Sequence, residues 1–197
     1  MIKTIVTSEG DLQVALARLD ALEGYYSNEA TDRGGETYRG VARIPNPNWE
    51  GWVIVDGLRA DPDFPDCLRT NQELSTRVEE FYRVYWKQCG ADCIADAILR
   101  GLHFEAAVNI GTRHAIKTLQ LILRLLDQGT PPSERLELDG SFGDKTYTLL
   151  VRLTSEQPER VHYYYRCGIL GHYLELILTH PEQVVYLNGW VKRLELG

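Results

Sequence analysis

The first hydrophobic pattern of the chain predicts an amphipathic helix over residues 11–22. Its apolar residues recur every three or four positions, which places them on one helical face. They are Leu12, Ala15, Leu16, Leu19 and Leu22. Ser8 is a suitable N-cap, with Asp11 where the carboxylate of a capping box sits. We expect the helix to end near Glu23 and Gly24, because glycine readily adopts the left-handed conformation that closes a helix.

The next segments favour turns and short strands. Residues 27–35 are dense in turn formers, and residues 37–43 alternate loosely, so we predict a loop followed by a short β-hairpin. Residues 45–65 contain four prolines and two tryptophans with little periodicity. Proline interrupts helices, so this segment is predicted to be an ordered surface excursion rather than a helix, and to wall a groove.

After Asn71 the pattern is almost entirely helical. Two apolar stripes have helical spacing. They are Leu74, Val78, Phe81, Tyr82, Tyr85 and Trp86, and then Ala115, Leu119, Ile122, Leu123 and Leu126. Residues 103–111 read as a buried segment and residues 129–143 as a loop. Two further helices are expected over residues 155–179 and 181–194, which makes the second half a helical bundle.

Composition fits one compact globular unit with two parts, which we place at residues 1–95 and 96–197. The chain has 197 residues, of which 44% are hydrophobic. Its net charge of -7 offers no basic surface for nucleic acid, so that partner is not expected. No stretch has the length of a membrane span or the pattern of a signal peptide. We therefore expect a soluble chain, made in the cytoplasm without a classical export signal.

Cysteine and histidine positions do not predict a metal site. The four cysteines are too few for a disulfide scaffold and form no paired CxxC motifs, and the five histidines include no HExxH. Cys89 and Cys93 stand four residues apart, where they could share a helix face. We interpret them as small buried residues.

Three residues are candidates for the hydrolysis of a glycosidic bond. That reaction requires a carboxylic acid that stays protonated near neutral pH and a second group that positions water. The helix dipole and burial are both expected to raise the pKa of Glu23. A hairpin through Gly34 and Gly35 would return Asp32 and Thr37 toward it. Each has a simpler interpretation: Glu23 as an ordinary helix-end residue, Asp32 as a turn cap, and Thr37 as a strand former.

The wider context resembles glycoside hydrolase family 108. The segment Glu23-Gly24-Tyr25-Tyr26, followed by Asp32-Arg33-Gly34-Gly35-Glu36-Thr37, is similar to that family's Glu-Gly-Gly-Tyr and Asp-x-Gly-Gly-x-Thr signature. Tyr25 replaces a glycine. Three later motifs resemble the predicted peptidoglycan domain that follows in the family. They are Val108-Asn109-Ile110-Gly111, Asp139-Gly140-Ser141-Phe142-Gly143 with Thr146, and Gly189-Trp190-Val191-Lys192-Arg193.

The resemblance implies a mainly α, lysozyme-like fold with a small β-hairpin beside the active-site cleft, and residues 96–197 as a peptidoglycan-binding half. It implies a muramidase that cleaves the β-1,4 bond between N-acetylmuramic acid and N-acetylglucosamine. Glu23 is the expected general acid, with Asp32 and Thr37 orienting water, and no metal or cofactor is needed. The residues expected to contact the glycan strands are Tyr26, Trp49, Trp52 and Asn109.

Several alternatives stay open. Glu36 is left out of the catalytic set, because strand alternation points it away from the face that Thr37 occupies. Asn109 has a structural interpretation as a partner of buried backbone. The same scaffold also suits a non-catalytic envelope-binding module or a chitosanase-like hydrolase. Acting on the periplasmic wall would require a holin, a dedicated secretion system or lysis, as for a prophage endolysin or an injected effector.

Overall fold

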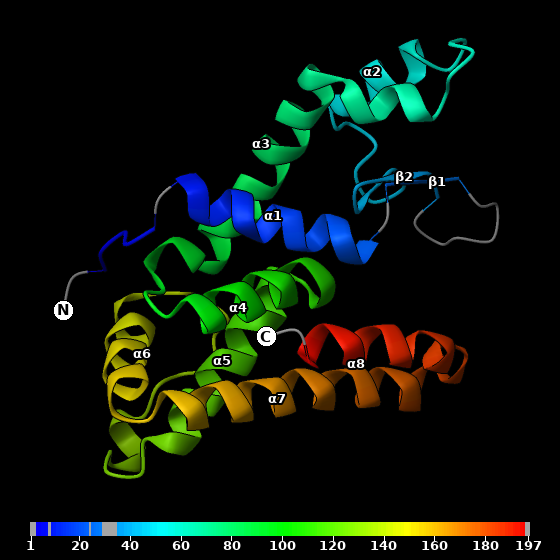
Figure 1. The fold of residues 1–197 in the computed structure, drawn as a ribbon. Helices are drawn as coiled ribbons and strands as arrows, with labels where there is room; N and C mark the ends of the chain where they lie inside the picture. Colours follow the sequence, from blue (N-terminus) through cyan, green and yellow to red (C-terminus); the bar gives the residue numbers. More distant parts are fainter. Residues whose placement is uncertain (1–2, 8, 24, 29–34, 196–197) are drawn as a thin grey trace. The chain divides into compact units, whose positions relative to one another are not determined.

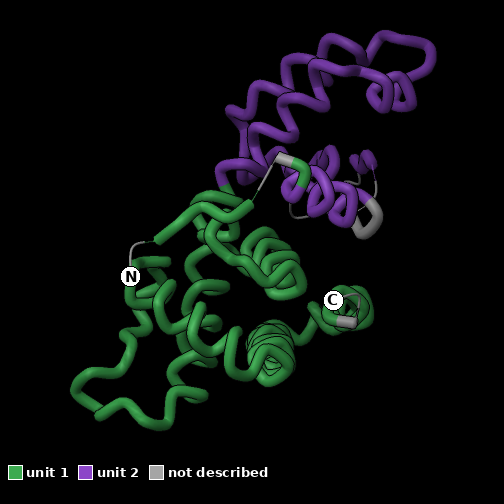
Figure 2. The backbone as a smooth tube through the Cα atoms, turned by 60° about the vertical axis from the view of Figure 1, so that its left-hand side comes forward, with its two compact units in different colours: residues 1–10, 85–197 green, residues 11–84 purple. Residues whose placement is uncertain are grey.

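The computed structural model describes residues 3–7, 9–23, 25–28 and 35–195, with the side chains of residues 9, 21–23 and 195 outside the description. It is mainly helical, with one small sheet (Figure 1). The chain divides into two compact units, one formed by residues 11–84 and the other by residues 1–10 and 85–197 (Figure 2). Each unit is considered separately below.

The unit of residues 11–84 holds the predicted catalytic segment. It contains most of helix α1 (Glu9–Glu23), strands β1 (Tyr26–Ser27), β2 (Thr37–Tyr38) and β3 (Val41–Ala42), helix α2 (Gly51–Gly57), a 3-10 turn at Asp66–Thr70 and the start of α3 (Gln72–Cys89). The predicted helix over residues 11–22 is confirmed by α1, whose Leu12, Leu16 and Leu19 are buried. Ser8 and Gly24, its expected capping residues, lie outside the described residues.

The predicted hairpin is part of a three-stranded antiparallel sheet in the order β1-β2-β3. Thr37 pairs with Ala42 across the hairpin and with Ser27 on the other side. The turn between β2 and β3 is formed by Arg39 and Gly40, both with positive φ (44° and 79°). Strand β1, only two residues long, carries no alternation and could not be predicted from sequence.

The prediction that residues 45–65 contain no helix was wrong, since α2 occupies Gly51–Gly57. None of the four prolines falls inside α2, so nothing prevents that turn of helix. Trp52 and Val55, three positions apart, are buried on one face of α2. Gly51 lets the Trp49 ring lie against the start of α2, because a Cβ atom at position 51 would be 2.2 Å from that ring.

The second unit is the helical bundle that the sequence predicts. Its helices are α4 (Ala97–Ile110), α5 (Thr112–Leu126), α6 (Asp144–Glu156), α7 (Pro158–Thr179) and α8 (Leu187–Glu195). Helix α5 is central, because it contacts α4, α6 and α7 (Figure 1). The sequence analysis did not predict α6. Its buried residues Thr146, Tyr147, Leu150 and Leu153 follow directly after the glycine-rich loop. The single helix expected over residues 181–194 is a 3-10 segment followed by α8.

The turn at residues 139–143 is held by the buried side chain of Gln120 on α5. The Gln120 amide nitrogen donates to the Asp139 carboxylate (2.8 Å), the Ser141 carbonyl (3.0 Å) and the Thr146 hydroxyl (3.1 Å). Its oxygen accepts the backbone N–H of Gly140 (2.9 Å). The hydrogen bonds that Asp139 accepts from the Gln120 side chain and from the backbone N–H of Ser141 lower its pKa. One side chain thus joins α5, the turn and α6.

Replacing Gln120 with methionine should lower the free energy of unfolding by about 2 kcal/mol. Methionine fills a similar volume but leaves the Gly140 N–H and the Thr146 hydroxyl without this partner, and unpaired polar groups are costly when buried. Urea unfolding of the full chain measures the loss. Gln128→Met is the matched control, since Gln128 is exposed. Equal stabilities for the two variants would contradict this role of Gln120.

Candidate active site

The structure describes the predicted catalytic residues unequally. Glu23 is the last residue of α1, as expected, but its side chain lies outside the described part, and so does all of Asp32. Thr37 lies in β2, where its hydroxyl donates to the carbonyl of Gly35 (3.2 Å). With its proton committed to that carbonyl, the Thr37 oxygen keeps lone pairs that can accept a hydrogen bond from water.

Arg39 ties the last turns of α1 to the sheet. Its Nε donates to Asp20 Oδ1 (2.7 Å), and the two side chains form a fork-like ion pair. Its N–H donates to the Tyr25 carbonyl (2.9 Å), and its carbonyl accepts the Tyr82 hydroxyl (2.8 Å). Asp20 lies three residues before Glu23, so this pair fixes the turn of helix that carries the predicted acid. The sequence analysis missed both residues, because no spacing rule links a helix residue to a turn nineteen positions later.

Glu36 is the centre of a buried ionic cluster. Its side chain is 4% exposed. It pairs with the guanidinium groups of Arg43 (2.7 Å) and Arg59 (2.6 Å), and it accepts the hydroxyl of Tyr26 (2.7 Å). Asp56 on α2 binds the same two arginines, which lower its pKa. This cluster fastens β1 and β2 to α2, so its role is structural and agrees with leaving Glu36 out of the catalytic set.

Replacing Glu36 with glutamine should lower the free energy of unfolding by about 2 kcal/mol. The buried charge is lost, and among the described residues both arginines keep Asp56 alone as an anionic partner. The loss is smaller than for a fully buried pair, because both guanidinium groups are partly exposed and their charges are screened. Chemical denaturation measures it. Glu50→Gln is the control, since Glu50 pairs with Arg77 at the surface and should change little.

The residues predicted to contact glycan lie in different environments. Trp52 is 3% exposed, its indole N–H donates to the Asn46 carbonyl (2.8 Å), and the Arg43 guanidinium covers its ring (4.3 Å to the centroid). That burial corrects the expectation that Trp52 walls a groove, because no indole face is left for a sugar. Trp49 is partly exposed beside Tyr38 and Phe81. Its use as a stacking surface stays a prediction.

Tyr26 and Tyr25 are both held by their hydroxyl groups. Tyr26 lies edge-on to Phe64 (5.2 Å between ring centroids). The pKa of Tyr26 is raised, mainly by burial and then by its hydrogen bond to Glu36. Tyr25, which replaces a glycine of the resembled motif, shares a hydrogen bond with the Tyr38 hydroxyl (2.7 Å). The Arg69 guanidinium lies 4.8 Å from its ring centroid. These contacts hold the side chain of Tyr25 at the position where the resembled motif has a glycine.

Asn109 belongs to the other unit and has structural partners there. Its amide nitrogen donates to the Glu105 carbonyl (2.9 Å) within α4, and its oxygen accepts from Arg193 on α8 (3.0 Å). Both ends of the amide therefore bind protein groups, which supports the structural interpretation. The contact also joins the Val108-Asn109-Ile110-Gly111 and Gly189-to-Arg193 motifs, which are distant in sequence.

The described residues show neither a metal-binding cluster nor a helix suited to a membrane. Among the described residues, no three or more His, Cys, Asp and Glu side chains gather in a way that would hold a metal ion. Of the helices described, none has the length and apolar character needed to cross a membrane. Cys89 and Cys93 are buried, as interpreted from sequence. Burial raises their pKa values to about 12 and about 11, so both stay neutral thiols.

Comparison with known proteins agrees with the motifs. Residues 16–111 match the glycosyl hydrolase 108 family, and residues 114–195 match the family described as a predicted peptidoglycan domain. The fold is similar to the solved structure of SagA from Brucella abortus, with a TM-score of 0.61, 19% sequence identity, and coverage of 95% of this chain and 91% of that chain. No curated protein matches. At this identity the structural likeness supports the fold alone.

The match to glycosyl hydrolase family 108 defines the class of the protein, a glycoside hydrolase, and the mainly helical fold agrees with it. More particularly, residues 16–111 belong to glycosyl hydrolase family 108 and residues 114–195 to the predicted peptidoglycan domain family. The chain is therefore a peptidoglycan hydrolase. The two family matches meet near residues 111–114, whereas the two compact units meet at residues 84 and 85. The domain boundary predicted from sequence, at residues 95 and 96, lies between these positions.

Proposed function

We propose that the chain hydrolyses the β-1,4 bond between N-acetylmuramic acid and N-acetylglucosamine, with Glu23 as the general acid. The observation that carries this proposal is the position of Glu23 at the end of α1, in a family 108 domain, three residues after the Asp20 that pairs with Arg39. A carboxyl group at the negative end of a helix has its charged form disfavoured, which suits a proton donor.

In this proposal Glu23 protonates the leaving glycosidic oxygen. Asp32 and Thr37 orient a water molecule on the opposite face of the sugar. The water attacks the anomeric carbon as the glycosidic bond breaks, and its proton passes to the Asp32 carboxylate. The Thr37 hydroxyl, which already donates to Gly35, is available as an acceptor for that water. Attack from the opposite face inverts the configuration of the anomeric carbon. No step uses a metal or a cofactor.

The proposed ligand is the glycan strand of peptidoglycan in the periplasm or cell wall. Tyr26 and Trp49 are the proposed contacts in the catalytic unit. Tyr26 is partly exposed with its hydroxyl bound to Glu36, so its ring is fixed in orientation. Trp49 is held by its indole N–H, which donates to the Arg77 carbonyl (3.3 Å). Rigid aromatic rings suit the apolar faces of pyranoses. Delivery by a holin, a secretion system or lysis belongs to the same proposal.

Product analysis tests the bond. Purified peptidoglycan, chitin and chitosan are incubated with the full chain, and released fragments are reduced with borohydride and weighed by mass spectrometry. The proposal expects fragments from peptidoglycan that carry reduced muramic acid. Reduced glucosamine ends, or release from chitosan alone, would assign a different bond. Binding of peptidoglycan without fragments would favour the non-catalytic module.

A further inference from the structure

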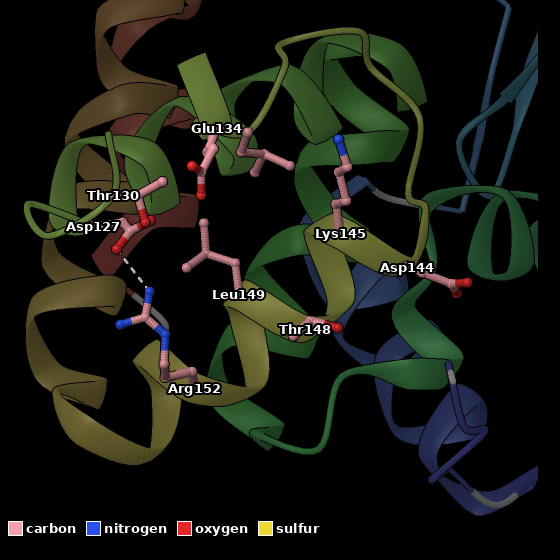
Figure 3. A pocket seen from close by; sticks show the side chains of 9 residues that line it. Asp127, Thr130, Glu134, Asp144, Lys145, Thr148, Leu149 and Arg152 are labelled. Atoms are coloured by element: carbon pink, nitrogen blue, oxygen red, sulfur yellow. Dashed lines mark hydrogen bonds and ion pairs between the residues drawn. The ribbon is translucent and has the colours of Figure 1, made fainter. Parts of the chain in front are cut away.

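A hollow in the second unit combines both signs of charge around an apolar floor. It has a volume of about 390 Å³ and lies between the end of α5, the loop of residues 130–136 and one face of α6 (Figure 3). Lys145, Leu149 and Arg152 line it from α6 at positions i, i+4 and i+7, which share a helix face. Its size is within the usual range of small-ligand sites, roughly 300–1,000 Å³.

Charges of both signs around this hollow lack an ion-pair partner. Among the described residues, the Lys145 ammonium and the carboxylates of Glu134 and Asp144 have none. Figure 3 shows Glu134 and Lys145 reaching into the space above α6 from different elements, with the Leu149 side chain also in that space. Leu136, from the loop, adds a nearly buried apolar surface.

Arg152, the second cation of the rim, already has anionic partners. Arg152 pairs with Asp127 at the end of α5 (2.7 Å), and it also approaches Glu156 (3.7 Å). A hydrogen bond from Thr130 and the Arg152 charge hold the pKa of Asp127 below its ordinary value. This pair fastens the end of α5 to α6, so Arg152 and Asp127 neutralise each other and the unpaired charges are left to meet a ligand.

The lining favours a charged peptide over a sugar. None of the described residues that line the hollow is aromatic, whereas pyranose rings pack well on aromatic faces. A cation and an anion separated by leucine side chains match a molecule that carries a carboxylate and an ammonium group on an aliphatic chain. Such charge-matched contacts give specificity for the ligand.

We propose that this hollow binds the peptide stem of peptidoglycan, with Lys145 contacting a stem carboxylate and Glu134 a stem ammonium group. The inference rests on the proposed function, since it gives the second domain a subsite on the same polymer that the first domain cleaves. The peptide's aliphatic segment lies over Leu136 and Leu149.

Calorimetry with the full chain tests the subsite directly. The probes are the stem tripeptide L-alanyl-γ-D-glutamyl-meso-diaminopimelate and a tetramer of N-acetylglucosamine without peptide. We expect Lys145→Glu to weaken tripeptide binding at least about tenfold, because it places two like charges together, while binding of the tetramer is unchanged. Lys192→Glu makes the same charge change on α8 outside the hollow and should have no effect. Thermal unfolding checks that the variants are folded.

Unchanged tripeptide affinity in Lys145→Glu, or no tripeptide binding by the wild-type chain, would overturn the inference. Glycan strands with and without stems separate its failure from that of the proposed function. If the wild type cleaves both and Lys145→Glu slows neither, only the subsite is wrong. If the wild type cleaves neither, the proposed function is wrong, while tripeptide binding still tests the hollow.

Discussion

Replacing Glu23 with glutamine should lower the rate of fragment release from peptidoglycan by roughly 10²–10⁴-fold, which is the usual contribution of a positioned general acid. Glutamine has nearly the same shape and the same hydrogen-bonding reach, but it has no proton to give to the leaving oxygen. The rate is measured from the reducing ends released by the full chain at saturating peptidoglycan.

Two controls make this result specific. Glu50→Gln makes the same chemical change at the surface of the same unit, where Glu50 pairs with Arg77, and should keep the wild-type rate. Binding of peptidoglycan by Glu23→Gln should persist, because glutamine keeps the size and shape of the glutamate side chain. A variant that releases fragments at the wild-type rate would exclude Glu23 as the acid and leave the family assignment intact.

The wild-type chain should lose up to about 3 kcal/mol of stability as the pH falls from about 6.5 to about 4, because of His103. This residue lies fully buried in α4, and desolvation lowers its pKa from 6.5 to about 4. Its Nε2 donates to the Cys89 carbonyl (3.0 Å), which can only accept, so Nδ1 is the acceptor of the Tyr165 hydroxyl (2.7 Å). A proton on Nδ1 would remove this acceptor, and the Tyr165 hydroxyl would have to direct its proton to the more distant Ala115 carbonyl (3.4 Å) instead.

The sign follows from proton uptake in each state. The unfolded chain binds a proton at His103 below about pH 6.5, whereas the native chain does so only near pH 4, so acid favours the unfolded state between these values. Above about pH 6.5 His103 is neutral in both states, so the native chain keeps its full stability. Asp127 has a pKa below its ordinary value, so its contribution to stability is lost at lower pH.

Urea unfolding at about pH 7 and about pH 5 measures the effect. His103→Gln should be less stable at neutral pH, because it disturbs the bonds to Cys89 and Tyr165, but it should lose much less stability between the two pH values. His172, whose pKa is also lowered by partial burial and by His114, contributes in the same direction and remains in both proteins. Equal losses in wild type and variant would contradict the role of His103 in this pH dependence.

The helices whose predictions succeeded have a signal that is local. Leu12, Leu16 and Leu19 define the buried face of α1 by spacing alone, and the stripe on α5 does the same. Their periodicity is a property of neighbouring residues, so no knowledge of the rest of the fold is needed. The family resemblance was also readable from sequence, because its motifs are short contiguous strings in a fixed order.

The errors arise where long-range contacts override local pattern. The helix α2 was rejected because prolines surround it, yet Trp52 and Val55 gain enough burial to form it. Helix α6 was missed because Gln120, on another helix, holds the turn that precedes it. Propensity describes a segment in isolation, whereas burial depends on the residues that the fold brings opposite it.

The sequence by itself determined the helical class, the order of the two domains and the place of Glu23 at a helix end, since each depends on spacing or on contiguous motifs. Only the tertiary structure decided which residues support that end. The pairing of Asp20 with Arg39 and of Glu36 with Arg59 joins positions 19 and 23 residues apart in the chain. Such contacts are set by the closing of the fold, and a linear pattern does not encode them.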